Sequence, residues 1–320
     1  MDHVLLVAEQ RGGTPLGQAL ELCTAARSFA PQVTACSWGE GAEHTAAVLG
    51  SHGAGTLLNV GDLGDRLAGP AVAAAIAGEV AKGAPDAVLI PASYDGRDIA
   101  ARLSVRLDRP LITNVSGLEL EGGSLLSSHT VFGGSKIVRA RFTAEGPAIF
   151  VVRAKSFAIR ELGGAAAKVV QVPGTELGAA DAARVISSHV EERSGPSLDA
   201  AKVVISGGRG LGAAEHYALI EQLAALLHGA AGASRAIVDA GWVPYARQVG
   251  QTGKTVKPEV YLAFGISGAT QHLVGMKGST HIVAVDKNPD APILKVADLG
   301  IVGDVHEVLP RLIAALEGRA

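Results

Sequence analysis

Short β-branched runs alternate with longer Ala-rich segments along much of the chain. The first favour strands and the second favour helices, so the alternation predicts an α/β fold with mostly parallel sheets flanked by helices. Aromatic residues make up only 4% of the chain while 41 residues are Gly, so the core must be aliphatic and many turns tight. The alternating runs of the first half are Val4 to Ala8, Leu16 to Phe29, Val33 to Ser37, Gly41 to Leu49, Asp86 to Pro91 and Arg97 to Leu107.

The alternation gives way to consecutive strand-like runs between Leu118 and Val152. Ser124 to Thr130, Lys136 to Phe142 and Ala148 to Arg153 follow one another without an intervening helical segment. Strands joined by short connections usually pair antiparallel. We therefore expect these three runs to be antiparallel additions.

A polar stretch from Ser187 to Ser197 has the charge, Gly and Pro content of a linker. A chain of 320 residues is long enough for two domains, so we predict an N-terminal domain over 1–193 and a C-terminal domain over 194–320. In the second, the predicted elements are strands at Lys202 to Ser206, Val260 to Phe264 and His281 to Val285, and helices at Ala213 to His228 and Val305 to Leu316.

Charge and cysteine content exclude several classes of protein. With 28 Lys and Arg against 31 Asp and Glu, the net charge of −3 predicts no broad attraction to nucleic acid or to an anionic membrane. Cys23 and Cys36 have no Cys-x-x-Cys spacing and fit a reducing compartment. The N-terminus shows no export signal, and no apolar stretch is long enough for membrane insertion.

Motifs for metal-dependent and hydrolytic chemistry are missing. There is no Gly-x-Ser-x-Gly and no pair of metal-binding cysteines, and His306-Glu307 is followed by Pro310 where a His-Glu-x-x-His motif needs its second histidine. We expect no metal site. Gly253-Lys254-Thr255 ends like a P-loop, but Gln248 stands where that loop needs its first glycine, so an ATP-binding P-loop is not predicted.

Glycines mark the ends of two predicted strands in the second half. Gly207 to Gly212 follows the first strand, and Gly265 to Gly268 follows the strand ending at Phe264. A helix that begins after such a turn presents free N–H groups to a phosphate, Arg209 could add a charged hydrogen bond, and Asp286 ends the next strand where a ribose would lie. The alternative is a pair of tight turns without a ligand. A Gly-x-Gly-x-x-Gly fingerprint is absent, which disfavours a common NAD-dependent dehydrogenase.

Three further side chains lie near these turns in the sequence. By default His272 would be a core or surface histidine, and Arg235 and Asp239 would be surface residues. Their clustering beside candidate phosphate-binding turns favours a role in a site.

Five blocks of the second half together resemble the alpha subunit of electron transfer flavoprotein. The N-terminal half is similar to the same family more loosely, through Leu89 to Ala92 and Val151 to Phe157. The five blocks are Gly207 to Gly210, Gly232 to Arg235, Val249 to Lys254, Gly265 to His272 and Asp298 to Asp304.

The resemblance implies a Rossmann-like C-terminal domain that binds one non-covalent FAD. It places Thr252 at flavin N5, Arg235 against the isoalloxazine and His272 at the O2 side, where these groups would tune the flavin. The implied cofactor-binding set is Arg209, Ser234, Arg235, Val249, Gly250, Gln251, Thr252, Ser267, Gly268, Ala269, Thr270, Gln271, His272, Asp286, Asp304 and Val305. Asp286 and Thr270 depart from the family, which commonly has asparagine and an aliphatic residue there.

The resemblance also implies partners. The alpha subunit pairs with a beta subunit, which would contain AMP or a second FAD, and the N-terminal domain would supply the interface. The pair would carry electrons from acyl-CoA or related dehydrogenases of fatty acid β-oxidation to a membrane quinone oxidoreductase, without substrate turnover of its own. The expected location is the bacterial cytoplasm, or the mitochondrial matrix of a eukaryote.

Two other functions stay open from the residues alone. An NAD-dependent oxidoreductase could use the same α/β domain and would be colourless. A non-redox adenine-nucleotide-binding module would also lack flavin absorbance, but it would have no evident use for Arg235, Thr252 and His272.

Overall fold

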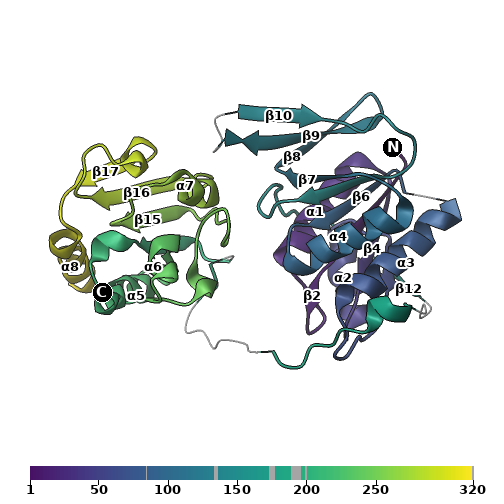
Figure 1. The fold of residues 1–320 in the computed structure, drawn as a ribbon, viewed down its shortest axis with the longest axis horizontal. Helices are drawn as coiled ribbons and strands as arrows, with labels where there is room; N and C mark the ends of the chain where they lie inside the picture. Colours follow the sequence, from purple (N-terminus) through teal and green to yellow (C-terminus); the bar gives the residue numbers. More distant parts are fainter. Residues whose placement is uncertain (84, 133–135, 173–176, 189–195, 199, 319–320) are drawn as a thin grey trace. The chain divides into compact units, whose positions relative to one another are not determined.

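The computed structural model describes residues 1–318 except 84, 133–135, 173–176, 189–195 and 199 (Figure 1). The chain divides into two compact units, Met1–His189 and Val190–Ala320. Residues 189–195 of the predicted linker, and with them the predicted boundary, lie outside the described residues.

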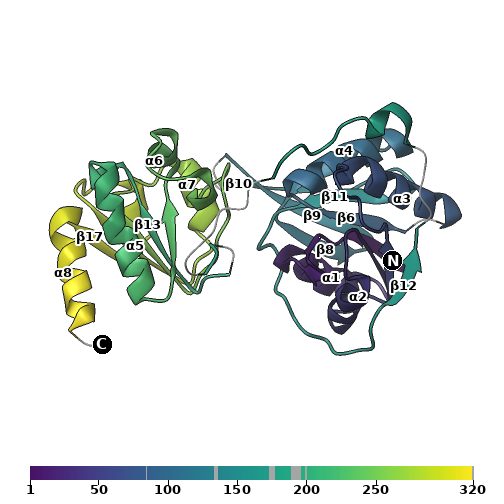
Figure 2. The ribbon, with the colours of Figure 1, turned by 90° about the horizontal axis from the view of Figure 1, so that it is seen from below.

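A seven-stranded sheet forms the centre of unit 1, and all its paired strands are parallel. Alternate side chains of the strands face opposite layers, so Val4 and Leu6 pack with α1 and α2 while Leu5 and Val7 pack with α3 and α4 (Figure 2). The helices are α1 (Gly17–Phe29), α2 (Ala42–Ser51), α3 (Ala68–Gly83) and α4 (Tyr94–Leu107). In sheet order the strands are β12 (Lys168–Gln171), β5 (Thr56–Asn59), β4 (Gln32–Ser37), β1 (His3–Val7), β6 (Ala87–Pro91), β11 (Ala148–Val152) and β7 (Leu111–Val115).

Only part of the predicted antiparallel region is antiparallel. Strands β8 (Gly117–Glu121), β9 (Ser124–Val131) and β10 (Lys136–Ala140) form a separate antiparallel sheet, as expected. The third predicted addition was wrong: β11 lies inside the large sheet and runs parallel to both β6 and β7. Its side chains are buried on both faces, with Ile149 in one layer and Phe150 in the other, which is the environment of a central parallel strand.

Unit 2 contains five strands, all parallel, with helices on both faces. Helices α5 (Tyr217–Leu226) and α8 (Val305–Glu317) cover one face, and α7 (Thr270–Met276) with the loop from 249 to 256 covers the other. The α/β class with mostly parallel sheets is thereby confirmed. In sheet order the strands are β14 (Ala230–Ala233), β13 (Val203–Gly207), β15 (Val260–Phe264), β16 (His281–Asp286) and β17 (Leu299–Val302).

Several elements of unit 2 differ from expectation, among them α6 (Arg235–Asp239) and β17, which were not predicted. The predicted helix from Ala213 to His228 begins only at Tyr217, because Gly212 has a positive φ and Ala214–His216 forms a 3-10 turn. Strand β14 was not predicted, since its sequence Ala-Ala-Gly-Ala contains no β-branched residue. It forms through its parallel pairing with β13.

The strand order of unit 2 creates a crevice at one edge. After β13 the chain moves to β14 on one side of it, and then to β15 on the other side. The loops that leave β13 and β15 therefore diverge, and the carboxyl ends of these two strands flank a topological switch point, where open α/β sheets bind ligands. None of the helices in the described part of the chain combines the length and hydrophobicity that a membrane span needs.

Candidate functional site

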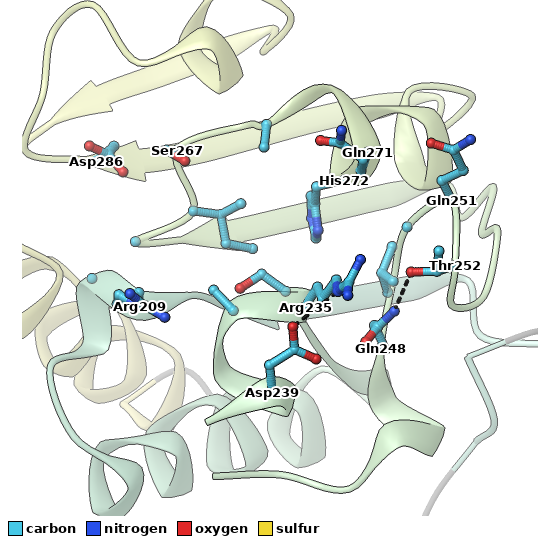
Figure 3. A pocket seen from close by; sticks show the side chains of 18 residues that line it. Arg209, Arg235, Asp239, Gln248, Gln251, Thr252, Ser267, Gln271, His272 and Asp286 are labelled. Atoms are coloured by element: carbon cyan, nitrogen blue, oxygen red, sulfur yellow. Dashed lines mark hydrogen bonds and ion pairs between the residues drawn. The ribbon is translucent and has the colours of Figure 1, made fainter. Parts of the chain in front are cut away.

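A cavity of about 710 Å³ opens at this switch point (Figure 3). Its wall comes from the turns after β13, β14 and β15, from the end of β16 and from the loop between η5 (Tyr245–Arg247) and β15. The volume lies within the range of small-molecule and cofactor sites. The predicted binding residues that line it are Arg209, Ser234, Arg235, Val249, Gly250, Gln251, Thr252, Ser267, Ala269, Gln271, His272 and Asp286.

Four predicted binding residues do not line the cavity. Gly268 packs its backbone against Ile293, where a Cβ atom would lie 2.4 Å from the Ile293 nitrogen. Thr270 is exposed at the start of α7, and Val305 is a buried core residue of α8. Asp304 caps α8 by accepting a hydrogen bond from the His306 N–H at 2.9 Å, and its pKa is lowered mainly by that bond. These residues shape the turns around the cavity without facing it.

Two glycine turns meet backbone to backbone at one end of the cavity. The Gly210 N–H donates to the Gly265 carbonyl at 3.0 Å, and a Cβ atom on Gly210 would lie 2.6 Å from the Gly265 Cα. Gly265 also has φ +61°, a conformation that favours glycine. Any side chain here would push the turns apart, so glycine is required at both positions for steric reasons.

The loop from 248 to 255, which ends in Gly253-Lys254-Thr255, is held by backbone hydrogen bonds. The Val249 N–H donates to the Ala233 carbonyl at 2.9 Å, and the Gln251 N–H donates to the Gln271 carbonyl at 2.7 Å. The Lys254 N–H donates to the Gln248 carbonyl at 2.7 Å and closes a tight turn. The loop is therefore pinned between β14 and α7, and the Gly-Lys-Thr sequence belongs to its closing turn.

Gln248 orients Thr252 at the rim of the cavity. The Gln248 side chain is buried, and its Nε2 donates to the Thr252 Oγ1 at 3.0 Å. Because the Thr252 oxygen accepts this bond, its own hydroxyl proton can be donated to a ligand. The sequence analysis did not identify Gln248 as a site residue. It considered Gln248 only because a P-loop would have glycine at that position.

Charged groups of both signs face the cavity. Arg235 Nε lies 3.0 Å from Asp239 Oδ2 one helical turn later, and both side chains are about 60% exposed. Exposed pairs of this kind contribute little to stability, typically about 0.3–0.5 kcal/mol. Arg209, also exposed, forms no ion pair with any described residue. The cavity thus presents two guanidinium groups, opposed by the carboxylates of Asp239 and Asp286.

His272 is the buried ionisable side chain among the described residues that line the cavity. It is only 6% exposed, its Nε2 lies 2.9 Å from the Tyr261 hydroxyl, and its Nδ1 has no hydrogen-bond partner among the described residues. Burial lowers the pKa of the imidazole to about 4, although the nearby Val249 backbone opposes the shift. His272 is therefore neutral near pH 7, with one ring nitrogen left for a ligand. Figure 3 shows its side chain directed toward Arg235 across the cavity.

The three predicted flavin-tuning residues are thus brought together. Arg235 comes from α6 (Arg235–Asp239), Thr252 from the pinned loop and His272 from α7, and all three line one cavity. Sequence reasoning could not place Tyr261 behind His272, because it appears in the sequence as one apolar residue of a strand.

Comparisons with known proteins point to the same family for both units. The family described as "Electron transfer flavoprotein domain" matches residues 4–177, and the family described as "Electron transfer flavoprotein FAD-binding domain" matches residues 197–277. The chain is 41% identical to the "Electron transfer flavoprotein subunit alpha" of Mycobacterium tuberculosis, over 100% of this chain and 99% of that protein.

Two other relatives extend the comparison. The protein of the same name from Thermoanaerobacterium thermosaccharolyticum is 38% identical over 98% of this chain and 97% of its own length. The "Electron transfer flavoprotein subunit alpha, mitochondrial" of Arabidopsis thaliana is 40% identical over 72% of this chain and 64% of its own length.

Proposed function

The chain belongs to the family of electron transfer flavoprotein alpha subunits, and from this membership we propose that its unit 2 binds one FAD and works as an electron carrier with a beta subunit. The observation that carries the proposal is the meeting of Arg235, Thr252 and His272 at one cavity from three separate segments. An electron carrier needs such groups around a flavin, and a site for adenine nucleotide alone does not.

The residues at the cavity fit a flavin in chemical terms. The neutral His272 leaves one buried ring nitrogen without a partner, and Thr252 has a hydroxyl proton to donate. The glycine turns bring backbone close to the cavity at its other end. A flavin ring has several acceptor atoms along one edge, and a pyrophosphate suits a glycine turn beside Arg209.

Each side chain has a separate task in this proposal. Arg235 supplies positive charge beside the ring, Thr252 donates to a ring nitrogen, and His272 donates to a ring oxygen without carrying charge. Bound FAD supplies reversible one- and two-electron redox chemistry. Since reduction places negative charge on the ring, a fixed guanidinium stabilises the reduced form and raises the potential.

The other predicted residues would hold the remainder of the cofactor. Arg209, Ser234 and the turn from Ser267 to Gln271 would bind the pyrophosphate and ribityl parts, and Asp286 would accept from ribose hydroxyls. Four further residues would contribute at this end through their backbone or by shaping the turns: Gly268, Thr270, Asp304 and Val305. Their contribution to FAD binding stays a prediction.

Partners are proposed on the same basis. The beta subunit would contain AMP or a second FAD, acyl-CoA or related dehydrogenases would donate electrons, and a membrane quinone oxidoreductase would accept them. The setting would be the bacterial cytoplasm, or the mitochondrial matrix if the source is a eukaryote.

Purification with the beta subunit tests the proposal. We expect a yellow heterodimer that releases FAD on denaturation, whereas a colourless protein with bound NAD or ADP would contradict it. Ala236 lies half-buried in the cavity wall, so Ala236→Trp should fill the cavity and abolish the yellow colour. Ala225→Trp adds the same side chain at an exposed position of α5 and should leave the colour unchanged.

A further inference from the structure

Tyr261 lies directly behind His272, outside the cavity wall. Its side chain is fully buried in β15, and its hydroxyl lies 2.9 Å from His272 Nε2. The other ring nitrogen, Nδ1, is also buried but has no partner in the described part of the chain. The imidazole therefore has a hydrogen-bond partner at Nε2 and none among the described residues at Nδ1.

The direction of the hydrogen bond follows from the neighbours. If Nε2 donated to the phenol oxygen, the Tyr261 proton would need another acceptor. The buried Ser206 hydroxyl lies near the phenol and opposes the burial-raised pKa of Tyr261, which is the effect of a group that donates to the phenol oxygen rather than accepting from it; it meets full hydrogen-bond geometry with no described residue. The consistent arrangement is that Tyr261 donates to Nε2, because a buried donor without an acceptor is unfavourable.

With Nε2 as the acceptor, the neutral imidazole carries its proton on Nδ1. The site thus contains a relay in which Tyr261 donates to His272 and His272 donates outward.

We propose that Tyr261 is a positioning residue that holds His272 as the neutral tautomer protonated on Nδ1, and so presents one N–H donor to an acceptor oxygen of the bound cofactor. The inference rests on the proposed function for the identity of the acceptor. An imidazolium would supply both a hydrogen bond and a positive charge. In this arrangement His272 supplies only the directed hydrogen bond, and Arg235 supplies the positive charge beside the ring.

The tautomer can be measured directly in the heterodimer labelled with ¹⁵N-histidine. Long-range ¹H–¹⁵N NMR distinguishes the two neutral tautomers from the imidazolium, and His272→Gln identifies the His272 signals by their loss. We expect a neutral ring protonated on Nδ1 at neutral pH. An imidazolium, or a ring protonated on Nε2, would overturn the proposal, and this outcome requires no variant of Tyr261.

Tyr261→Phe tests the positioning role. We expect signals of the second tautomer to appear and the Kd for FAD to rise about five- to tenfold. Tyr217→Phe is the matched control, because Tyr217 is another buried tyrosine of unit 2 whose hydroxyl donates to the Gly232 carbonyl at 3.1 Å. It should leave the His272 tautomer unchanged and the Kd within about twofold.

Unchanged His272 signals and an unchanged Kd in Tyr261→Phe would refute the positioning role. A heterodimer without FAD would instead refute the proposed function. The two failures can be told apart, because the tautomer of His272 is read from the protein whether or not flavin is bound.

Discussion

The two units share a parallel sheet with a topological switch point and surround that point with different loops. In unit 1 the chain passes from β1 to β4 on one side and later to β6 on the other, and in unit 2 it passes from β13 to β14 and later to β15. Both sheets are parallel, so both present the edge where a ligand could bind. The two units differ in the loops that leave these strands.

In unit 1 the side chains at this edge bond to one another and to the backbone. The Ser93 hydroxyl donates to the Glu9 carboxylate, and the Gly96 N–H donates to Ser93 Oγ at 2.8 Å. Gln10 Nε2 donates to the carbonyls of Trp38 and Glu40, at 2.6 and 3.0 Å. These polar groups are satisfied from within the unit, whereas the buried Ser37 Oγ at the end of β4 has no hydrogen-bond partner among the described residues.

In unit 2 the loops at the corresponding edge leave a cavity, although closely packed glycines occur at both edges: Gly13 and Gly41 in unit 1, and Gly210 and Gly265 in unit 2. The turns at Gly210 and Gly265 have no side chains to fill the edge, and a cavity remains in front of them. His272 Nδ1 has no partner among the described atoms. The comparison teaches that a parallel sheet supplies the position of a site, and that its loops decide which groups face it.

The largest effect should come from the glycine contact that keeps the edge of unit 2 open. Gly265→Ala should lower the free energy of unfolding by about 3 kcal/mol, because the residue has φ +61° and the new Cβ would lie 2.7 Å from the Gly210 Cα. Gly122→Ala in unit 1 should cost only about 1 kcal/mol, since Gly122 has φ +60° but open space around it. Urea unfolding followed by Trp242 for unit 2 and by Trp38 for unit 1 measures both. Equal costs would show that close approach is not what requires Gly265.

Acidification should destabilise unit 2 through His272. Burial lowers its folded-state pKa from 6.5 to about 4, so between these values the unfolded chain binds the proton more readily and stability falls as the pH falls. The contribution is about 3 kcal/mol over the whole window. His272→Gln should remove this loss when unfolding is followed by Trp242 and should change nothing in the Trp38 signal. A pH dependence in Trp242 identical to wild type would mean that His272 is not held neutral by burial.

A smaller effect, on the flavin potential, should distinguish two similar Arg–Asp ion pairs. Arg235–Asp239 lies at the cavity, and Arg102–Asp98, at 2.9 Å, lies on α4 of unit 1. Replacing either arginine by alanine should change stability by less than about 0.5 kcal/mol, since both pairs are partly exposed. Only Arg235→Ala should lower the two-electron potential of bound flavin, by about 30 mV, equivalent to about 1.4 kcal/mol. Redox titration of both variants is the measurement, and equal potentials would refute the role of Arg235.

Features set by local conformation could be predicted from the sequence. The glycine turn at Gly265 is one example, because its φ of +61° is a local conformation that favours glycine. The alternation of strands and helices is another example, since β-branched segments have an intrinsic preference for strands and Ala-rich segments for helices.

Features set by distant partners could not be predicted. The run from Ala148 to Val152 is plainly a strand, but only its pairing with β6 and β7 makes it parallel. Tyr261 becomes important because α7 packs against β15 and brings His272 to its hydroxyl. Gln248 likewise acts through Thr252, four residues later, in a loop whose turn is fixed by its contacts with β14 and α7.

A crystal structure of the heterodimer with its cofactor tests the central claim most directly. The account predicts an isoalloxazine ring in unit 2, within about 4 Å of the Arg235 guanidinium and with a ring nitrogen about 3 Å from Thr252 Oγ1. A flavin bound at the carboxyl edge of unit 1, or a ring that contacts none of Arg235, Thr252 and His272, would contradict it.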